Sequence, residues 1–146
     1  MDVAKRAYAA GLFDGEGCVQ VYMGQGRTRN CFRTTLSISG VDLRPLRWLC
    51  SRYGGNISVA RLNGNPRPDG SPRRDLGTWQ VFGEEAERFA RDIRPFLIVK
   101  AEQLDLWFDA RGMLRPRGRQ ARGQLTDEEY EQRREIVAKV KELKRS

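Results

Sequence analysis

The chain has 146 residues, of which 39% are hydrophobic and 32% charged, a composition that predicts one soluble domain spanning 1–146. Its 27 Lys and Arg outnumber 19 Asp and Glu, and the net charge of +8 favours a polyanionic partner such as nucleic acid. Because histidine is absent from the sequence, Ser-His-Asp catalysis, Cys-His catalysis and zinc sites that need imidazole are excluded.

The first predicted helix covers residues 3–13 (VAKRAYAAGLF), with Asp2 as its N-cap and the following Asp-Gly pair as its end. Ala7, Gly11 and Gly15 are spaced four apart and therefore share one helix face. Such a stripe permits close approach of another backbone, which is either a helix of the same chain or a second chain.

Four short strands are expected at 18–24, 31–39, 56–60 and 78–83, because apolar and polar residues alternate there. A helix over about 43–53 separates the second strand from the third. It begins after an Asp N-cap and ends at a Gly-Gly pair.

The C-terminal part is predicted to be helical. One helix covers 84–93, and the chain restarts after a proline into a second helix over 96–110 that ends near Gly112. A basic loop over 113–125 leads to a last helix over 126–143, which opens with a Thr-x-x-Glu capping box. The core is thus expected to cover about 1–112.

This order predicts an α+β fold with a mixed α-β-β-α-β-β-α core, in which helices cover one face of a four-stranded antiparallel sheet. The other face would carry side chains that form hydrogen bonds: Gln20, Tyr22, Arg33, Thr35, Ser37, Asn56, Ser58, Thr78 and Gln80. Such a face on a basic protein suits the reading of base edges in a major groove of double-stranded DNA.

The stretch AGLFDGEG (10–17) resembles the LAGLIDADG motif of homing endonucleases, and the predicted order of elements matches that family. PFLIVK (95–100) resembles the family's segment with an active-site lysine. The C-terminal LTDEEYEQRREIVAKVKEL (125–143) looks like the last helix of members with a single motif. The resemblance covers nearly the whole chain and implies the family's saddle-shaped DNA-binding sheet.

The resemblance also implies a homodimer, because only one motif is present. In the family the motif helix lies on the dimer axis, which places Ala7, Ala10, Gly11 and Asp14 at the interface. A two-fold dimer in turn implies a long, roughly palindromic DNA target.

Phosphodiester hydrolysis needs an activated water, neutralisation of the phosphate charge and help for the leaving oxygen, all of which hard divalent ions supply. Glu16 matches the motif's acidic metal ligand, with the Gly15 carbonyl as a neighbouring ligand. Asp14 is either a second ligand or a residue that orients its neighbours. Mg²⁺ is the expected ion, Mn²⁺ is expected to substitute for it, and Ca²⁺ is expected to bind without cleavage.

Two further residues receive a catalytic role from the resemblance. Lys100 matches the active-site lysine, which would neutralise developing charge or position the attacking water; the alternative is a lysine that extends from a core segment to solvent. Arg44 matches a supporting basic residue. Gly40 departs from the pattern, because a polar side chain that organises water often occupies this position in the family.

The loops carry arginines that would contact phosphates and fix register without reading sequence, or would simply be solvated: Arg27, Arg29, Arg61, Arg73, Arg74, Arg115, Arg117 and Arg119.

The sequence therefore predicts a metal-dependent, site-specific double-strand DNA endonuclease. The alternative is a DNA-binding regulator or an intron RNA maturase on the same scaffold, without cleavage. A nuclease of the Pro-Asp/Glu-x-Lys class fits less well, because its Glu-x-Lys pair would lie in the terminal helix.

Neither a membrane span nor a signal peptide is expected, and three scattered cysteines indicate a reducing, cytoplasmic compartment. No small-molecule substrate is expected.

Overall fold

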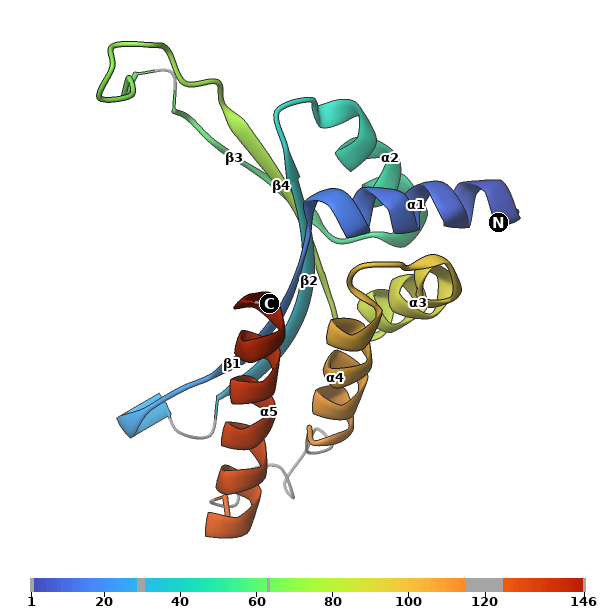
Figure 1. Ribbon diagram of the computed structural model, residues 1–146, viewed down its shortest axis with the longest axis vertical. Helices are drawn as coiled ribbons and strands as arrows, with labels where there is room; N and C mark the ends of the chain where they lie inside the picture. Colours follow the sequence, from blue (N-terminus) through green and yellow to red (C-terminus); the bar gives the residue numbers. More distant parts are fainter. Residues whose placement is uncertain (1, 29–30, 63, 115–124, 146) are drawn as a thin grey trace. The chain divides into compact units, whose positions relative to one another are not determined.

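The computed structural model describes residues 2–28, 31–62, 64–114 and 125–145 (Figure 1). Its elements, in chain order, are α1 (Val3–Glu16), β1 (Gly17–Met23), η1 (Gly26–Thr28), β2 (Phe32–Gly40), α2 (Leu43–Tyr53), β3 (Asn56–Ala60), β4 (Leu76–Phe82), α3 (Gly83–Ile93), η2 (Arg94–Phe96), α4 (Ala101–Gly112) and α5 (Asp127–Arg145). The predicted order of helices and strands is confirmed.

The four strands form one sheet in the order β1-β2-β4-β3. Strands β3 and β4 pair antiparallel, with Asn56 opposite Gln80 and Ala60 opposite Leu76. The predicted α+β fold with a four-stranded antiparallel sheet is therefore confirmed.

Contacts within the chain cluster into two compact units. The first unit comprises Met1–Cys18 and Leu36–Ile98, and the second comprises Val19–Thr35 and Val99–Ser146. The predicted single domain over 1–146 stays a prediction.

The core of the first unit is built around the ring of Phe89 on α3. Phe13 of α1, Tyr53 of α2 and Trp79 of β4 all meet this ring edge to face, with centroids 5.8, 5.0 and 4.9 Å away. The indole N–H of Trp79 donates to the carbonyl of Gly54 at 2.8 Å, which satisfies its one polar atom. Three helices are thus fixed to one face of the sheet by aromatic contacts.

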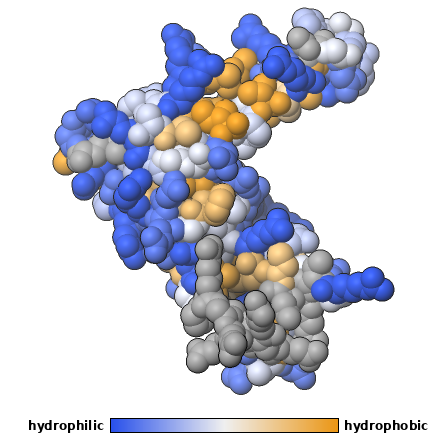
Figure 2. All heavy atoms as spheres, turned by 180° about the vertical axis from the view of Figure 1, so that it is seen from behind, coloured by the Kyte–Doolittle hydropathy of each residue, from blue (hydrophilic) through white to orange (hydrophobic). Residues whose placement is uncertain are grey.

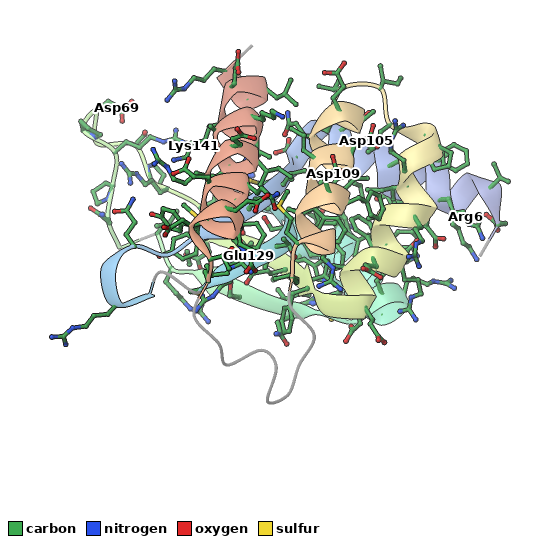
Figure 3. All side chains as sticks on the ribbon, turned by 90° about the horizontal axis from the view of Figure 1, so that it is seen from below. Arg6, Asp69, Asp105, Asp109, Glu129 and Lys141 are labelled. Carbon is green, nitrogen blue, oxygen red and sulfur yellow. The ribbon has the colours of Figure 1, made fainter. Side chains whose placement is uncertain are left out.

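The core of the second unit joins the outer part of the β1–β2 hairpin to two helices. Phe32 of β2, Ala110 of α4 and Ile136 of α5 form its buried centre. Arg133 of α5 is 4% exposed; its guanidinium lies 4.7 Å from the Phe32 ring centroid and donates to the carbonyl of Met113 at 3.3 Å. Figures 1 and 3 show α5 running beside α4.

No helix in the described ranges is long and apolar enough to cross a membrane.

The start of α4 differs from the prediction. The helix expected over 96–110 begins only at Ala101, because Leu97 has an extended conformation and bends follow it. As a result, Ile98 and Val99 are 89% and 70% exposed, although their apolar run is typical of a core helix. The capping box of the last helix is confirmed, since Thr126 and Glu129 exchange hydrogen bonds of 3.1 and 3.4 Å.

Candidate nucleic-acid interface

Helix α1 ends three residues later than predicted. It starts at the Asp2 cap, whose carboxylate accepts from Lys5 N–H at 2.8 Å, and runs through Glu16. Gly17 caps the helix by donating its N–H to the Phe13 carbonyl, and a Cβ at this position would overlap the ring and carbonyl of Phe13. Gly17 leaves the helix with an extended backbone, whereas Gly15 lies within the helix.

One face of α1 is open. Ala7, Gly11 and Gly15 are exposed, and a Cβ built on either glycine meets nothing within 4 Å. Ala10 lies elsewhere on the helix and is 1% exposed, because it packs with Phe13 into the core of the first unit. The predicted dimer contact at Ala10 therefore has no accessible surface, whereas those at Ala7 and Gly11 stay predictions.

The two carboxylates of the motif have different surroundings. Glu16, the last residue of α1, is exposed and has no hydrogen bond or ion pair with any described residue. Asp14 is half-buried, and its Oδ2 accepts from the backbone N–H of Ile98 at 2.7 Å. This contact supports an orienting role for Asp14, and leaves Glu16 as the carboxylate available to a ligand.

The end of α1 offers oxygen donors to a hard cation. The last carbonyls of a helix lack intrahelical partners, and the dipole makes this end negative. The Glu16 carboxylate and the Gly15 carbonyl belong to this last turn. In the described ranges, the end of α1 included, no three Cys, Asp or Glu side chains come together to hold a metal ion. The donors fit a divalent ion that takes its remaining ligands from outside one chain.

Lys100 and Arg44 are the other two predicted catalytic residues. Lys100 belongs to the second unit, is half-buried and forms the N-cap of α4, where its carbonyl accepts from Leu104 N–H at 3.0 Å. Glu16 belongs to the first unit. The assignment of Lys100 to the active site stays a prediction.

Arg44 is bound to the carboxylate that caps its own helix. Its Nε lies 3.0 Å from both Asp42 oxygens, and Asp42 also accepts from Arg44 N–H at 3.0 Å. The Arg44 hydrogen bond lowers the pKa of Asp42 to about 2. A Cβ at the nearby Gly40 would lie 3.7 Å from the Asp42 carbonyl, so the backbone there has room for a side chain.

A polar sheet face in the second unit brings together four predicted base-reading residues. Gln20 and Tyr22 are two apart on β1, and Arg33 and Thr35 are two apart on β2, so each pair shares a face. The Thr35 hydroxyl donates to Gln20 Oε1 at 2.7 Å, which shows that the two faces coincide. Arg27 in η1 is exposed, and Arg29 lies outside the described residues.

A second polar face lies on the sheet of the first unit. Asn56 is opposite Gln80 and Ser58 is opposite Thr78, so all four share a face; Asn56, Ser58 and Gln80 are exposed. Ser39 of β2 joins them through a 2.9 Å hydrogen bond between its hydroxyl and that of Thr78. Ser39 was not predicted, although alternation along β2 places it on this face.

The remaining candidates vary in exposure. Ser37, expected on the sheet face that forms hydrogen bonds, is only 6% exposed and lies on the interior strand β2. Arg61 is exposed and forms an ion pair with Asp75, with 3.6 Å between its Nη1 and the Asp75 Oδ2. Arg73 is half-buried and Arg74 is exposed. Arg115, Arg117 and Arg119 lie outside the described residues.

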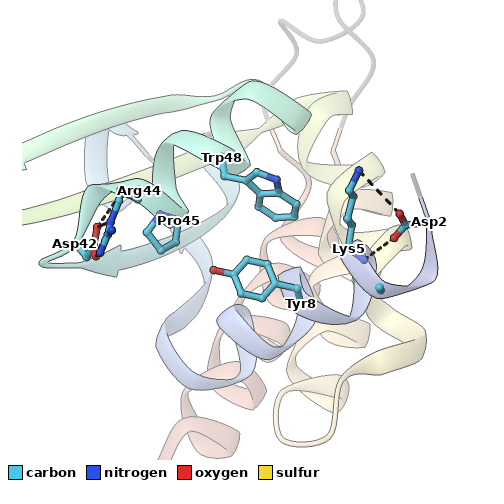
Figure 4. A pocket seen from close by; sticks show the side chains of 8 residues that line it. Asp2, Lys5, Tyr8, Asp42, Arg44, Pro45 and Trp48 are labelled. Carbon is cyan, nitrogen blue, oxygen red and sulfur yellow. Dashed lines mark hydrogen bonds and ion pairs between the residues drawn. The ribbon is translucent and has the colours of Figure 1, made fainter.

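A groove of about 710 Å³ lies between α1 and the start of α2 (Figure 4). Tyr8 and Trp48 face each other across it, with ring centroids 5.2 Å apart, and the Asp2–Lys5 and Asp42–Arg44 pairs lie at its two ends. Tyr8 is 50% exposed. In the surface view, hydrophobic areas interrupt a largely hydrophilic surface (Figure 2).

The chain is similar in structure to several solved homing endonucleases. An archaeal intron-encoded homing endonuclease, I-Vdi141I, complexed with DNA, has a TM-score of 0.71 at 16% identity over 96% of this chain and 84% of its own. The LAGLIDADG meganuclease I-AabMI, bound to uncleaved DNA, has a TM-score of 0.65 at 15% identity over 91% of this chain and 43% of its own. I-CvuI, in complex with its target in the presence of 2 mM Ca, has a TM-score of 0.54 at 18% identity over 95% of this chain and 96% of its own.

No protein-family model matches the sequence, and a search of curated proteins finds no match. The similarity therefore rests on the three-dimensional structure, and it extends over nearly the whole chain. The α+β fold with its four-stranded antiparallel sheet matches these structures. This protein has the fold of the LAGLIDADG homing endonucleases.

Proposed function

We propose that this protein is a site-specific double-strand DNA endonuclease that acts as a homodimer with divalent metal ions. The observation that carries the proposal is the exposed carboxylate of Glu16, which has no partner among the described residues and ends the motif helix of a homing-endonuclease fold. The Glu16 side chain makes no contact with the described residues that would stabilise the fold.

DNA binding is supported by charge and by chemistry. The net charge of +8 attracts a polyanion, and the two polar sheet faces carry amide, hydroxyl and guanidinium groups suited to base edges and phosphates. The similar structures I-Vdi141I, I-AabMI and I-CvuI are complexes with DNA, which also supports this partner.

Dimerisation is supported by the open face of α1. Space around Gly11 and Gly15 would admit a second backbone, and Val3 and Tyr8 on the same helix are 66% and 50% exposed. A two-fold axis through this face would bring the Glu16 carboxylates of both chains to one place. The DNA target would then be roughly palindromic.

In the proposed site, Glu16 and the Gly15 carbonyl of each chain would hold a hard divalent ion, for which we propose Mg²⁺, with Mn²⁺ as a substitute and Ca²⁺ binding without cleavage. Such an ion supplies activation of a water and neutralisation of the phosphate charge. The presence of Ca in the I-CvuI complex supports the use of a divalent ion. Lys100 would neutralise developing charge or position the water, and Arg44 would support the site.

The test is cleavage of a library of long randomised duplexes by the purified protein with Mg²⁺. We expect cutting at one long site, loss of cutting in Glu16→Gln, and DNA binding that Glu16→Gln leaves within a few-fold of the wild type. The matched control is Glu142→Gln, which makes the same charge change at an exposed position of α5 and should cut normally. Normal cutting by Glu16→Gln would contradict the catalytic assignment.

A DNA-binding protein without nuclease activity is the second candidate, and the absence of a side chain at Gly40 favours it. In that case the wild type would select one DNA site and leave it uncut with Mg²⁺ and with Mn²⁺. Tighter binding of a structured intron RNA than of any DNA site would instead identify a maturase.

A further inference from the structure

The hydrogen bond between Thr35 and Gln20 fixes one of the proposed base-reading side chains. The Thr35 hydroxyl donates to Gln20 Oε1 at 2.7 Å within the second unit, while the Gln20 amide nitrogen has no partner among the described residues. Gln20 is exposed and Thr35 is half-buried. The amide is thus held with its oxygen toward Thr35 and its nitrogen directed away from Thr35.

This orientation matters because a glutamine amide is bifunctional. Its oxygen accepts hydrogen bonds and its NH₂ group donates two. A free glutamine pairs with adenine in a bidentate way: its NH₂ donates to N7 and its oxygen accepts from the N6 amino group. Guanine instead presents two acceptors, N7 and O6, in the major groove. Thr35 occupies one of the two lone pairs of the Gln20 oxygen and turns that oxygen toward itself, whereas the NH₂ group keeps both donors for the guanine edge.

The neighbouring side chain has the same preference. Arg33 lies two residues from Thr35 on β2, is exposed and carries donors only. Arginine donating to guanine O6 and N7 is the commonest specific contact in the major groove. The hairpin face of the second unit therefore presents mainly donors to the DNA.

We propose that Thr35 acts as a specificity-determining residue, which holds Gln20 so that it reads guanine in preference to adenine. This inference rests on the proposed function, since it concerns a base within the DNA target. Thr35 itself is a positioning residue, because its hydroxyl acts through the Gln20 amide.

The experiment is selection of bound sites from a randomised DNA library with Ca²⁺, so that the readout is binding. Gln20→Ala first identifies, in each half-site, the base position that depends on Gln20. The wild type should prefer guanine there, and Thr35→Val, which removes the hydroxyl at nearly constant volume, should shift the preference toward adenine by about tenfold. Thr35→Ser keeps the donor and should retain guanine. Ser51→Ala is the control: it removes a hydroxyl of α2 that donates to the Trp48 carbonyl at 2.7 Å and should leave this position unchanged.

Each outcome has one meaning. A preference for adenine in the wild type, or guanine retained in Thr35→Val, overturns the role of Thr35 and leaves the proposed function standing. If the wild type enriches no sequence at all, the proposed function fails and this inference fails with it. Thermal unfolding of each variant shows that a changed preference does not come from a loss of folded protein.

Discussion

Asp14 accepts a hydrogen bond from the backbone N–H of Ile98 at 2.7 Å, although 84 positions separate the two residues. The bond links the motif helix to the segment that precedes Lys100 in the chain. The bond supports an orienting role for Asp14, and its role as a metal ligand stays a prediction.

Substitution of Asp14 separates these two roles. Asp14→Asn keeps an acceptor for the Ile98 N–H, so we expect a folded protein that retains most of its DNA cleavage. Asp14→Ala removes the acceptor and should lower the free energy of unfolding by about 1–2 kcal/mol. Urea unfolding and single-turnover cleavage measure the two effects. Complete loss of cleavage in a stable Asp14→Asn protein would identify Asp14 as a metal ligand instead.

Gly11 and Gly17 of the motif should respond differently to alanine. Gly17→Ala places a Cβ against the Phe13 ring and carbonyl, and should destabilise the fold by about 1–3 kcal/mol. Gly11→Ala meets no atom of its own chain and should stabilise α1 by up to about 1 kcal/mol. Thermal unfolding of the two variants should therefore show shifts in opposite directions, and equal shifts would contradict the geometry at Gly17.

The same Gly11 position tests the dimer. A leucine there leaves the single chain unobstructed, but it would fill the space that a second helix needs. We expect sedimentation to show a dimer for the wild type and a monomer for Gly11→Leu, with DNA cleavage lost in the variant. An exposed position of α5, Lys141→Leu, is the control for added apolar surface. A wild type that sediments as a monomer both free and on DNA would exclude the proposed dimer.

Gly40 offers a gain-of-function test. The backbone has room for a side chain, since a Cβ would lie 3.7 Å from the nearest atom, the Asp42 carbonyl oxygen. If the wild type cleaves slowly because nothing organises water at this position, Gly40→Gln should raise the single-turnover rate by about tenfold. Gly40→Leu controls for bulk and should give no increase. An unchanged rate for Gly40→Gln would mean that position 40 does not organise water.

The Asp42–Arg44 pair predicts a dependence of stability on acid. Because the folded pKa of Asp42 is lowered to about 2, its contribution is present above the ordinary carboxylate pKa and is lost as the pH falls through 2. Asp42→Asn keeps a capping side chain but loses the ion pair. Its free energy of unfolding should therefore be lower than that of the wild type at pH 5 and approach the wild-type value near pH 2. Urea unfolding at both values provides the comparison, and a difference that persists at pH 2 would assign the effect to capping.

The bounds of α2 were predictable because local groups determine both ends. Asp42 caps the first turn, and Gly54 leaves the helix with φ of +81°. By contrast, the end of α1 depends on the close approach of the Phe13 ring to Gly17. The late start of α4 accompanies the hydrogen bond that the Ile98 N–H donates to Asp14. Neither contact has a signature in a short stretch of sequence.

The candidate site shows the same division. Alternation along the strands predicted the polar faces, including the side on which Gln20 and Thr35 meet. It did not predict that Ser37 is covered, because burial depends on which strands flank β2 in the sheet. Nor did the motif alone show that Ala10 faces the core while Gly11, its neighbour, is exposed.

The packing of Arg133 over Phe32 means that the hairpin which would read DNA is supported by the opposite end of the chain. Transplanting β1 and β2 alone into a related scaffold would separate Phe32 from the arginine and from Ile136. To transfer DNA specificity to a protein of the same fold, α4 and α5 therefore have to be moved together with the hairpin. The transferred unit consists of two separate stretches of sequence.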